Sequence, residues 1–227
     1  MAQLTMTTLY HSFNFITGYK ADDPSPRSME WRLIVLESFA GVPGFIAAGF
    51  RHFYSLRHLE RDHGFIYTFL EEAENERMHL LVCMKMFDAG WPTRALVMAT
   101  QVIMTPGLML VYAIKPKAVH RFVGYLEETA CHTYSNVIRH CETEGTQLNK
   151  AWAHLDAPLV AKHYWNLEQD ASWVTCLKHI LADESHHRDV NHTIADLDGP
   201  NNSNPFVHKH EGDFDAAAKR HVKQLLE

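Results

Sequence analysis

Residues 181–192, LADESHHRDVNH, combine acidic and imidazole side chains with apolar residues at helical spacing. The positions that recur at steps of three and four residues, and so share one helix face, are Leu177, Ile180, Glu184, His187, Asn191 and Ile194. Within a helix predicted over 171–197, Glu184 and His187 point inward together, and two residues three apart can hold one metal ion. Asp183 and His186 lie one position back and form the less favoured ligand pair, so Asp183 is expected to support the site by hydrogen bonding.

The same Glu-x-x-His pattern occurs on a second predicted helix, over 65–89, where Glu76 and His79 lie within LEEAENERMHL (70–80). A third copy, Glu60 and His63, ends at Gly64 in a charged stretch and is interpreted as a solvated helix end. One copy alone is weak evidence for a metal site, because Glu and His are frequent in this chain. Two copies on separate long helices favour such a site.

Two further carboxylates, Glu37 and Glu127, lie in apolar surroundings on helices predicted over 29–53 and from 116 to about 145. A carboxylate in apolar surroundings is costly unless a charged group pairs with it. The order Glu, Glu-x-x-His, Glu, Glu-x-x-His is the ligand set of di-iron and di-manganese four-helix bundles. Carboxylate and imidazole ligands together suit iron or manganese. The alternative is a core that holds four ion-paired glutamates and two histidines.

The composition is that of a globular protein, since 46% of the 227 residues are hydrophobic and 21% are charged. It excludes a disordered chain. The net charge of −6 argues against a general nucleic-acid binder, so no nucleic-acid partner is expected. The four cysteines form no Cys-x-x-Cys pair and are expected to be free thiols.

Helical patterns run through the chain, whereas alternating strand patterns are nearly absent. We therefore expect an all-α protein, a ferritin-like four-helix bundle with a two-metal centre and short membrane-surface helices. It is expected to be one domain over 1–227, with a core over 30–207 and a tail over 208–227 that contains a short amphipathic helix. Thr93 is expected to cap the helix that follows it.

Two stretches, 1–19 and 95–114, contain no charged residue and are expected to face a membrane. The second is long enough to span a bilayer, although Pro106 and Gly107 interrupt it. Three interpretations of it remain open: a buried core helix, a membrane span, or a helix lying in the membrane interface. The N-terminal stretch lacks the basic residues of a signal peptide or a transit peptide.

Four motifs of the chain resemble those of the cyanide-insensitive alternative oxidases. They are LESFAGVPG (36–44), NERMHL (75–80), RFVGYLEETA (121–130) and LADESHHRDVNH (181–192). The resemblance implies a monotopic, homodimeric protein with two iron ions in a di-iron centre. It also implies a quinol oxidase that couples ubiquinol oxidation to the four-electron reduction of dioxygen to water, without proton pumping. The implied partners are ubiquinol, dioxygen and a lipid membrane surface.

The resemblance also assigns roles to individual residues. The residues that match the family's iron ligands are Glu37, Glu76, His79, Glu127, Glu184 and His187, with Glu76 and Glu184 as bridges. Tyr134 matches a tyrosine close to the irons, and a plain core tyrosine is the alternative. The residues that match supporting positions around the irons are Asn75, Asp183 and Trp165.

The quinol pocket and the dimer interface are assigned by the same resemblance. The residues that match the quinol pocket are Arg32, Leu36, Leu126, Ala130 and Thr133, with phospholipid anchoring as the alternative role of Arg32. The residues that match the dimer interface are His52, Arg57, Arg77 and Gln101.

Several features depart from the family's pattern. Thr129 stands in LEETA where the family commonly has a third glutamate, but this is not a ligand position. The N-terminal stretch lacks an arginine and an aspartate that some members place near the quinol, and Asn14 is the candidate replacement. No cysteine precedes Cys83, so the N-terminal regulatory disulfide of plant members is not expected.

Four alternatives to a ubiquinol oxidase remain open at this point. They are a related plastoquinol oxidase, a di-iron hydroxylase or desaturase acting on a lipid, a ferritin-like iron store, and a purely structural membrane-associated bundle. The expected location is one face of an inner membrane. The cytoplasmic face of a bacterial membrane is favoured over the matrix face of the mitochondrial one.

Overall fold

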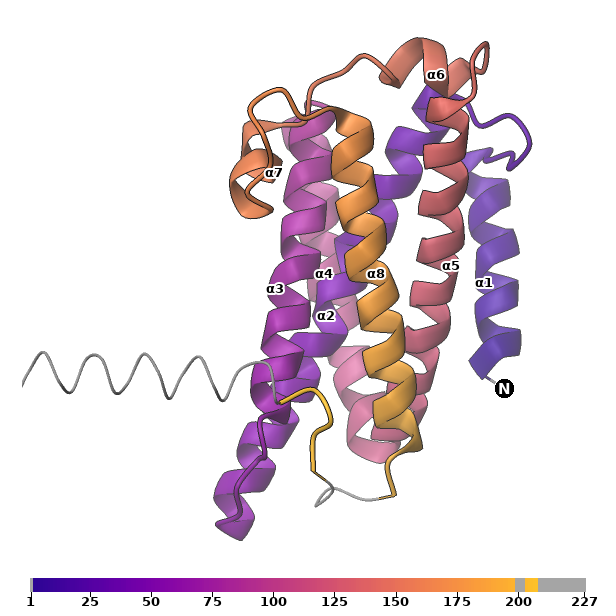
Figure 1. Cartoon of the computed structure of the whole chain (residues 1–227). Helices are drawn as coiled ribbons and strands as arrows, with labels where there is room; N and C mark the ends of the chain where they lie inside the picture. Colours follow the sequence, from indigo (N-terminus) through magenta and orange to yellow (C-terminus); the bar gives the residue numbers. More distant parts are fainter. Residues whose placement is uncertain (1, 199–202, 208–227) are drawn as a thin grey trace, which may run out of the picture.

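The computed structural model describes residues 2–198 and 203–207, and the regular secondary structure in that part of the chain is helical (Figure 1). The helices are α1 (Ala2–Thr17), α2 (Pro26–His58), α3 (Phe65–Met86), α4 (Trp91–Ile114), α5 (Pro116–Glu142), α6 (Gln147–Trp152), α7 (Leu159–Tyr164) and α8 (Trp173–Asp196). The all-α prediction is confirmed. The predicted helix in the tail over 208–227 lies outside the described residues.

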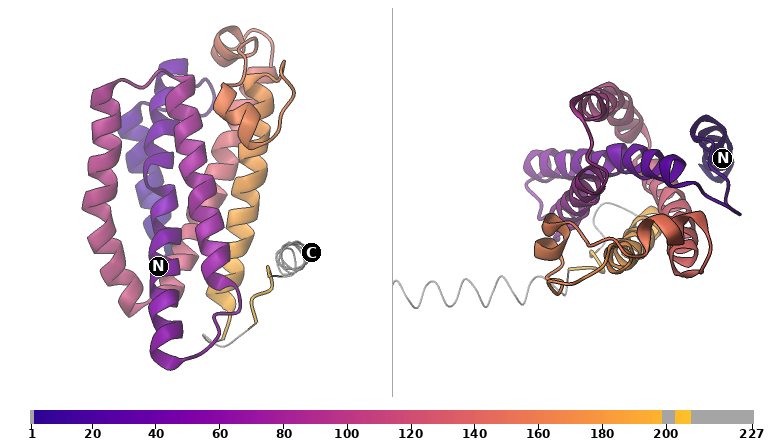
Figure 2. Two further views of the ribbon diagram at one scale, coloured as in Figure 1. Left: turned by 90° about the vertical axis from the view of Figure 1, so that its left-hand side faces the viewer. Right: turned by 90° about the horizontal axis from the view of Figure 1, so that it is seen from above.

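Four long helices, α2, α3, α5 and α8, run side by side, with α2 and α8 opposite in direction to α3 and α5, which confirms the predicted four-helix bundle (Figures 1 and 2). α2 packs mainly on α3, and α5 packs mainly on α8. Two further helices lie outside the bundle, α4 along α2 and α5, and α1 along α5. The interior between the four long helices is therefore closed on every side by helix.

Local sequence explains where the bundle helices begin. The Ser25 hydroxyl accepts a hydrogen bond from the backbone N–H of Ser28 and caps α2, and Pro26 follows at the first helical position. Ser172 caps α8 in the same way, through the backbone N–H of Thr175. A proline in the first turn costs no hydrogen bond, because the N–H groups there have no partner within the helix.

The predicted beginning of α4 was wrong. Thr93 does not cap this helix, which begins at Trp91 with Gly90 at the cap position. Pro92 occupies the first turn, where a proline fits, so the helix begins before the threonine. Pro106 does not interrupt α4 either, because packing of the helix along α2 and α5 outweighs the one hydrogen bond that proline removes.

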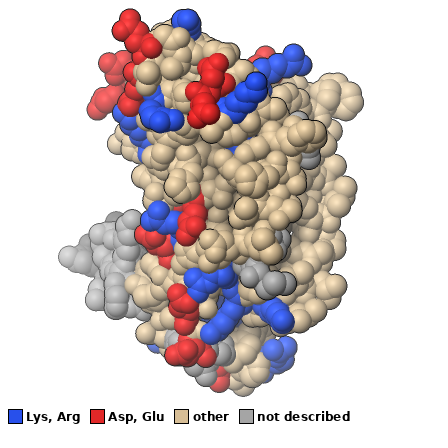
Figure 3. Space-filling model, turned by 90° about the vertical axis from the view of Figure 1, so that its right-hand side faces the viewer, with Lys and Arg blue, Asp and Glu red and all other residues tan. Residues whose placement is uncertain are grey.

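Most of α4 is exposed, so the interpretation of residues 95–114 as a buried core helix was also wrong. Among its described side chains only Val97 and Tyr112 are buried. α2 and α4 are both long and apolar enough to cross a membrane, but the apolar stretch of α2 lies mostly inside the bundle. On the face that carries α1, a wide uncharged area lies on the right of the view, with charged groups above it, below it and at mid-height to its left (Figure 3).

A close crossing of α2 and α3 sets the height at which their polar residues meet. A Cβ atom added to Gly44 would lie 2.6 Å from the backbone oxygen of Phe69. A Cβ atom on Gly41 would lie 3.4 Å from the Cβ of Glu76. Only glycine allows this approach. It brings the backbone of α2 against the part of α3 that carries Glu76.

The third Glu-x-x-His copy lies in a loop and not at a helix end. α2 ends at His58, because Leu59 adopts a left-handed backbone conformation with φ of 55°. Glu60 and His63 are exposed, as expected for a solvated segment. Asp62 between them pairs with Arg51 of α2 at 2.7 Å, which ties the loop to the bundle.

Candidate metal centre

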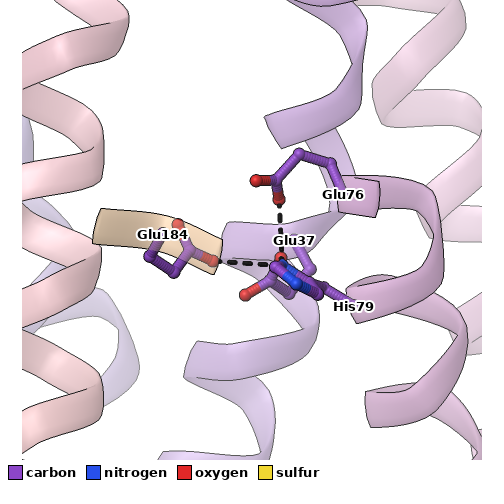
Figure 4. Close-up of side chains that lie close together, drawn as sticks. All are labelled: Glu37, Glu76, His79 and Glu184. Carbon is purple, nitrogen blue, oxygen red and sulfur yellow. Dashed lines mark ion pairs between the residues drawn. The ribbon is translucent and has the colours of Figure 1, made fainter. Parts of the chain in front are cut away.

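The six predicted metal ligands come from all four bundle helices and lie in the interior. Glu37 is on α2, Glu76 and His79 on α3, Glu127 on α5, and Glu184 and His187 on α8. None of these side chains is more than 4% exposed. One ligand atom each of Glu37, Glu76, His79 and Glu184 lies within 4.8 Å of the others (Figure 4).

Both imidazoles turn the same nitrogen toward the carboxylates. The Nδ1 atom of His79 lies 3.2 Å from an oxygen of Glu184, 3.4 Å from one of Glu76 and 3.8 Å from one of Glu37. The Nδ1 atom of His187 lies 2.5 Å from the other oxygen of Glu76. The two oxygens of Glu76 therefore face two different imidazoles.

These close contacts are not ordinary hydrogen bonds. The buried atoms without a hydrogen-bond partner of proper geometry include both oxygens of Glu76, Oε2 of Glu37, Oε1 of Glu127, and the Nδ1 atoms of His79 and His187. Buried polar atoms are normally paired. Six buried oxygen and nitrogen atoms that face one another without hydrogen bonds are the arrangement expected of metal ligands. The donor set therefore fits two divalent ions.

The electrostatics of the cluster point the same way. Burial and the nearby Glu184 raise the pKa of Glu37 and that of Glu127 well above the ordinary value. Burial alone would raise the pKa of Glu76 too, but His79 and His187 hold it well below its usual range. Glu76 in turn outweighs burial at His187 and raises that pKa to about 9. Four carboxylates against two imidazoles leave excess negative charge, which bound cations would neutralise.

The outer nitrogen of His79 is held by the residues predicted to support the site. Oδ2 of Asp183 lies 3.2 Å from Nε2 of His79. The same oxygen accepts hydrogen bonds of 2.9 Å from Nδ2 of Asn75 and from Nε1 of Trp165. Sequence reasoning missed Tyr164, whose hydroxyl accepts a second bond from Asn75. His186, the less favoured ligand, is exposed.

Tyr134 is buried beside the cluster, two turns after Glu127 on the same face of α5. Its hydroxyl donates a short hydrogen bond to Oε1 of Glu37. Burial and the charge of Glu37 raise the pKa of Tyr134 well above its ordinary value. The phenol is therefore protonated and directed at a predicted ligand.

The predicted quinol residues lie where α2 and α5 meet under α1. Arg32 is fully buried, donating to Oδ1 of Asn14 at 2.5 Å and to the Thr133 hydroxyl at 3.5 Å. The rings of Tyr10, Phe13 and Tyr19 face its guanidinium group at 4.1–5.2 Å. Phospholipid anchoring by Arg32 is thus not compatible with this buried position. Leu126 is buried in the same interior, and Leu36 and Ala130 are half-buried.

The four predicted interface residues lie on the outside of the bundle. His52 and Arg57 are exposed on α2, and Gln101 is half-buried on α4. Arg77, on α3, pairs with Glu74 of the same chain at 2.5 Å. The structure contains one chain, so the interface stays a prediction.

Besides Asp183, a further carboxylate lies near the predicted ligands, the buried Glu72, and sequence reasoning missed it. Glu72 lies one turn before Glu76 on α3, is buried, and accepts a hydrogen bond of 2.8 Å from Nδ2 of Asn191. Its position four residues before Glu76, on the same helix face, is the signal that could have identified it. Two surface cavities, of about 740 Å³ and about 300 Å³, are lined by residues other than the predicted quinol set.

Comparison with known sequences connects this geometry to a family. The profile described as "Alternative oxidase" matches residues 1–196. Proteins named "Alternative oxidase, mitochondrial" are similar to this chain. The one from Venturia inaequalis is 37% identical over 99% of this chain and 66% of its own length. The one from Aspergillus niger is 38% identical over 97% and 65%, and that from Neurospora crassa is 45% identical over 84% and 53%.

The chain thus spans about half to two thirds of the length of these curated relatives. The expectation of a bacterial cytoplasmic face finds no support in them, because their names place them in mitochondria. The family match confirms the resemblance carried by the four sequence motifs. The chain belongs to the alternative oxidase family.

Proposed function

We propose that this protein oxidises ubiquinol and reduces dioxygen to water at two iron ions held by Glu37, Glu76, His79, Glu127, Glu184 and His187. The observation that carries the proposal is the buried set of ligand atoms that converge without hydrogen-bond partners, in a chain of this family. The reaction balances when two quinols release four electrons and four protons to one dioxygen, which gives two quinones and two waters.

Glu76 is the proposed bridging ligand, because its two oxygens face the Nδ1 atoms of His79 and His187 separately. Glu184 is the second proposed bridge, since it lies next to both His79 and Glu127. Iron bound by these residues would supply most of the redox chemistry of the reaction. The surrounding residues hold the ligands in place and keep bulk water out, since the cluster is buried.

Tyr134 is the proposed source of a proton and an electron at the site, and Glu37 is the proposed acceptor of the proton. The phenol donates to Glu37, so a proton can move between Oη of Tyr134 and Oε1 of Glu37 without a change in packing. Asp183, Asn75 and Trp165 fix the orientation of the His79 ring.

The proposed quinol site lies between Arg32, Leu36, Leu126, Ala130 and Thr133, beneath α1. Arg32 and Thr133 supply polar groups for the quinol hydroxyls, and the apolar side chains face the ring. Because α1 and its residue Asn14 cover this place, we infer that α1 moves when quinol enters.

We propose that the protein lies on one face of a membrane through α1 and α4. α4 exposes large apolar side chains along its length, including Val102 and Ile103, and α1 exposes Leu4 and Phe15. α4 packs lengthwise on the bundle, so a membrane span by α4 would carry the charged bundle surface into hydrocarbon. Binding to one face also offers no path for proton pumping. The names of the relatives favour a mitochondrial location, and within it we propose the matrix face of the inner membrane.

We further propose a homodimer in which His52, Arg57, Arg77 and Gln101 lie at the interface. The support is their position on the outer faces of the neighbouring helices α2, α3 and α4. Sedimentation in detergent tests this, with a dimer expected for the native chain and a monomer for Arg57→Glu. A native monomer would contradict the proposal.

Quinol-dependent oxygen uptake in the presence of cyanide tests the proposed reaction. We expect two quinols to be consumed for each dioxygen, with no oxygen inserted into any lipid. Glu127→Gln, which removes one ligand charge, is expected to abolish uptake. A lipid product that contains oxygen would indicate a hydroxylase, and iron uptake far above two per chain would indicate an iron store.

A further inference from the structure

The larger of the two cavities, of about 740 Å³, opens on the bundle surface where α2, α4 and α5 meet. Its volume is typical of cavities that hold small-molecule ligands. None of the predicted metal ligands and none of the predicted quinol residues line it. The proposed reaction therefore leaves this cavity without a role.

The cavity is long and mostly apolar. Its lining on α2 runs from Phe45 to Arg57, a rise of about 18 Å along the helix. Buried apolar side chains, among them Ile46 of α2 and Phe69 of α3, form the inner wall. Gly49 also lines the cavity, and a Cβ atom added to it would have no atom within 4 Å. An elongated apolar space of this kind suits a hydrocarbon chain.

The buried polar side chains of the inner wall already have partners. The Tyr112 hydroxyl lies 2.9 Å from Nε2 of His120, and Nδ1 of His120 lies 2.9 Å from Oδ1 of Asn191. A polar ligand gains little where the wall groups are already hydrogen-bonded to each other, whereas a hydrocarbon chain needs no partner. The inner part of the cavity therefore favours an apolar occupant.

The charged residues that line the cavity are all cations. They are Arg51, Arg57 and Lys117, and no Asp or Glu of the described residues lines it. Arg51 pairs with Asp62 at 2.7 Å, whereas Arg57 and Lys117 are exposed and form no ion pair within the described part of the chain. α2 ends and α5 begins at the lower end of the bundle, so these two charges lie at the same end of the cavity (Figure 1). The positive end of the α5 dipole adds to them.

The mouth of the cavity carries exposed apolar side chains. Phe45 and Phe53 of α2 and Met109 of α4 all line it and are exposed. Large apolar side chains gathered on a surface and bordered by charged groups indicate a place where a partner or a membrane binds. Because α4 is the helix proposed to lie on the membrane, a lipid can enter the cavity directly from that surface.

We propose that this cavity binds an acyl chain of one anionic phospholipid, with the phosphate group at the end that carries Arg57 and Lys117. Basic pockets between membrane-associated helices bind anionic headgroups in this way. The inference goes beyond the proposed oxidase reaction and rests only on the proposed membrane contact of α4. Since Arg57 is also a predicted interface residue, the tests below leave it unchanged.

Native mass spectrometry of the detergent-solubilised chain tests the proposal by counting bound lipid. The probes are phosphatidylglycerol and phosphatidylcholine with identical acyl chains, which differ in net charge. We expect one phosphatidylglycerol per chain and weaker retention of phosphatidylcholine. In Lys117→Gln the affinity for phosphatidylglycerol is expected to fall by about fivefold, the usual contribution of one cation near anionic lipid. Lys150→Gln, at an exposed lysine of α6 outside the cavity, is the matched control and is expected to bind as the native chain does.

Filling the cavity is the second test. Gly49→Leu places a side chain in the open space and is expected to weaken phosphatidylglycerol binding by at least about tenfold, because excluding even two methylene groups of the lipid has that effect. Gly107→Leu is the matched control, since a Cβ atom at this glycine of α4 also has nothing within 4 Å and the residue does not line the cavity. Circular dichroism checks that both variants fold, and Lys117→Gln keeps the test decisive should Gly49→Leu not fold.

Equal retention of the two lipids by the native chain would overturn the inference, as would unchanged phosphatidylglycerol affinity in Lys117→Gln or in a folded Gly49→Leu. Displacement of the lipid by excess ubiquinol would assign the cavity to quinol instead, and a dimer that retains no lipid would assign it to a second copy of the chain; both would overturn the inference. A native chain that sediments with vesicles but retains no phosphatidylglycerol overturns this inference alone, whereas one that binds no vesicles overturns the proposed membrane contact.

Discussion

Replacing Glu72 by Gln should make the stability of the metal-free protein less dependent on pH. Burial raises the folded-state pKa of Glu72 from 4.5 to about 7. Because the pKa of Glu72 is higher in the folded state than in the unfolded chain, this one carboxyl group lowers the free energy of unfolding as pH rises from about 4.5 to about 7. A difference of about 2.5 pKa units corresponds to about 3 kcal/mol at high pH. Gln keeps the acceptor for Asn191 but carries no charge to bury.

The assay is urea unfolding of both proteins at pH 5 and pH 8, in detergent with a chelator present so that metal binding does not contribute. We expect the free energy of unfolding of Glu72→Gln, relative to the native chain, to rise by about 2–3 kcal/mol between the two pH values. Titrating groups far from Glu72 are shared by the two proteins and largely cancel in this comparison. A difference that stays constant with pH would refute the reasoning, as would a variant less stable than the native chain at pH 8.

Three further perturbations test other parts of the account. Gly44→Ala forces a Cβ atom to within 2.6 Å of a backbone oxygen on α3 and should lower the free energy of unfolding by about 1–3 kcal/mol. Gly49→Ala, where a Cβ atom would meet nothing within 4 Å, should not lower it. Equal effects of the two substitutions would contradict the close crossing of α2 and α3. Tyr134→Phe should retain bound iron but reduce quinol oxidation by about a hundredfold, the order expected for a positioned proton donor, and near-native activity would leave Tyr134 a plain core residue. The double substitution Val102→Asp and Ile103→Asp should weaken binding to lipid vesicles by at least about tenfold in a sedimentation assay, because burying each native side chain contributes roughly 1.5–3 kcal/mol. Unchanged binding would contradict the proposal that α4 contacts the membrane.

The inward face of α8 could be predicted from the sequence because its periodicity is undisturbed. All six residues of that face, from Leu177 to Ile194, are buried. Glu37 and Glu127 were expected inside because of their apolar surroundings, and Glu76 because it belongs to a Glu-x-x-His pair on a long helix; all three are buried. The order of the motifs along four helices then predicted that these side chains meet.

Other features depend on contacts between helices that periodicity does not report. A chain of hydrogen bonds joins the buried side chains of Tyr112, His120, Asn191 and Glu72, which are up to 119 positions apart in the sequence. Its members look like isolated polar residues until α3, α4, α5 and α8 are packed together. Asn191 is the exception, because it already belongs to the inward series of α8.

Arg32 shows a limit of a different kind. The sequence left phospholipid anchoring open as the alternative role of Arg32, but in the structure α1 covers Arg32 and three aromatic rings face it. The beginning of α4 was missed for a local reason, since proline in a first turn makes a threonine cap unnecessary. In both cases the sequence allows two local arrangements, and the folded chain decides between them: α1 covers Arg32, and α4 begins at Trp91 before Thr93.

The central claim is that two iron ions in one buried cluster carry out quinol oxidation. The most direct test adds Fe²⁺ to the metal-free protein in steps and measures, on the same sample, bound iron and cyanide-resistant oxygen uptake with ubiquinol. The account predicts that binding stops at two ions per chain and that uptake appears only as the second ion binds. Full uptake with one ion bound, or none with two bound, would contradict it.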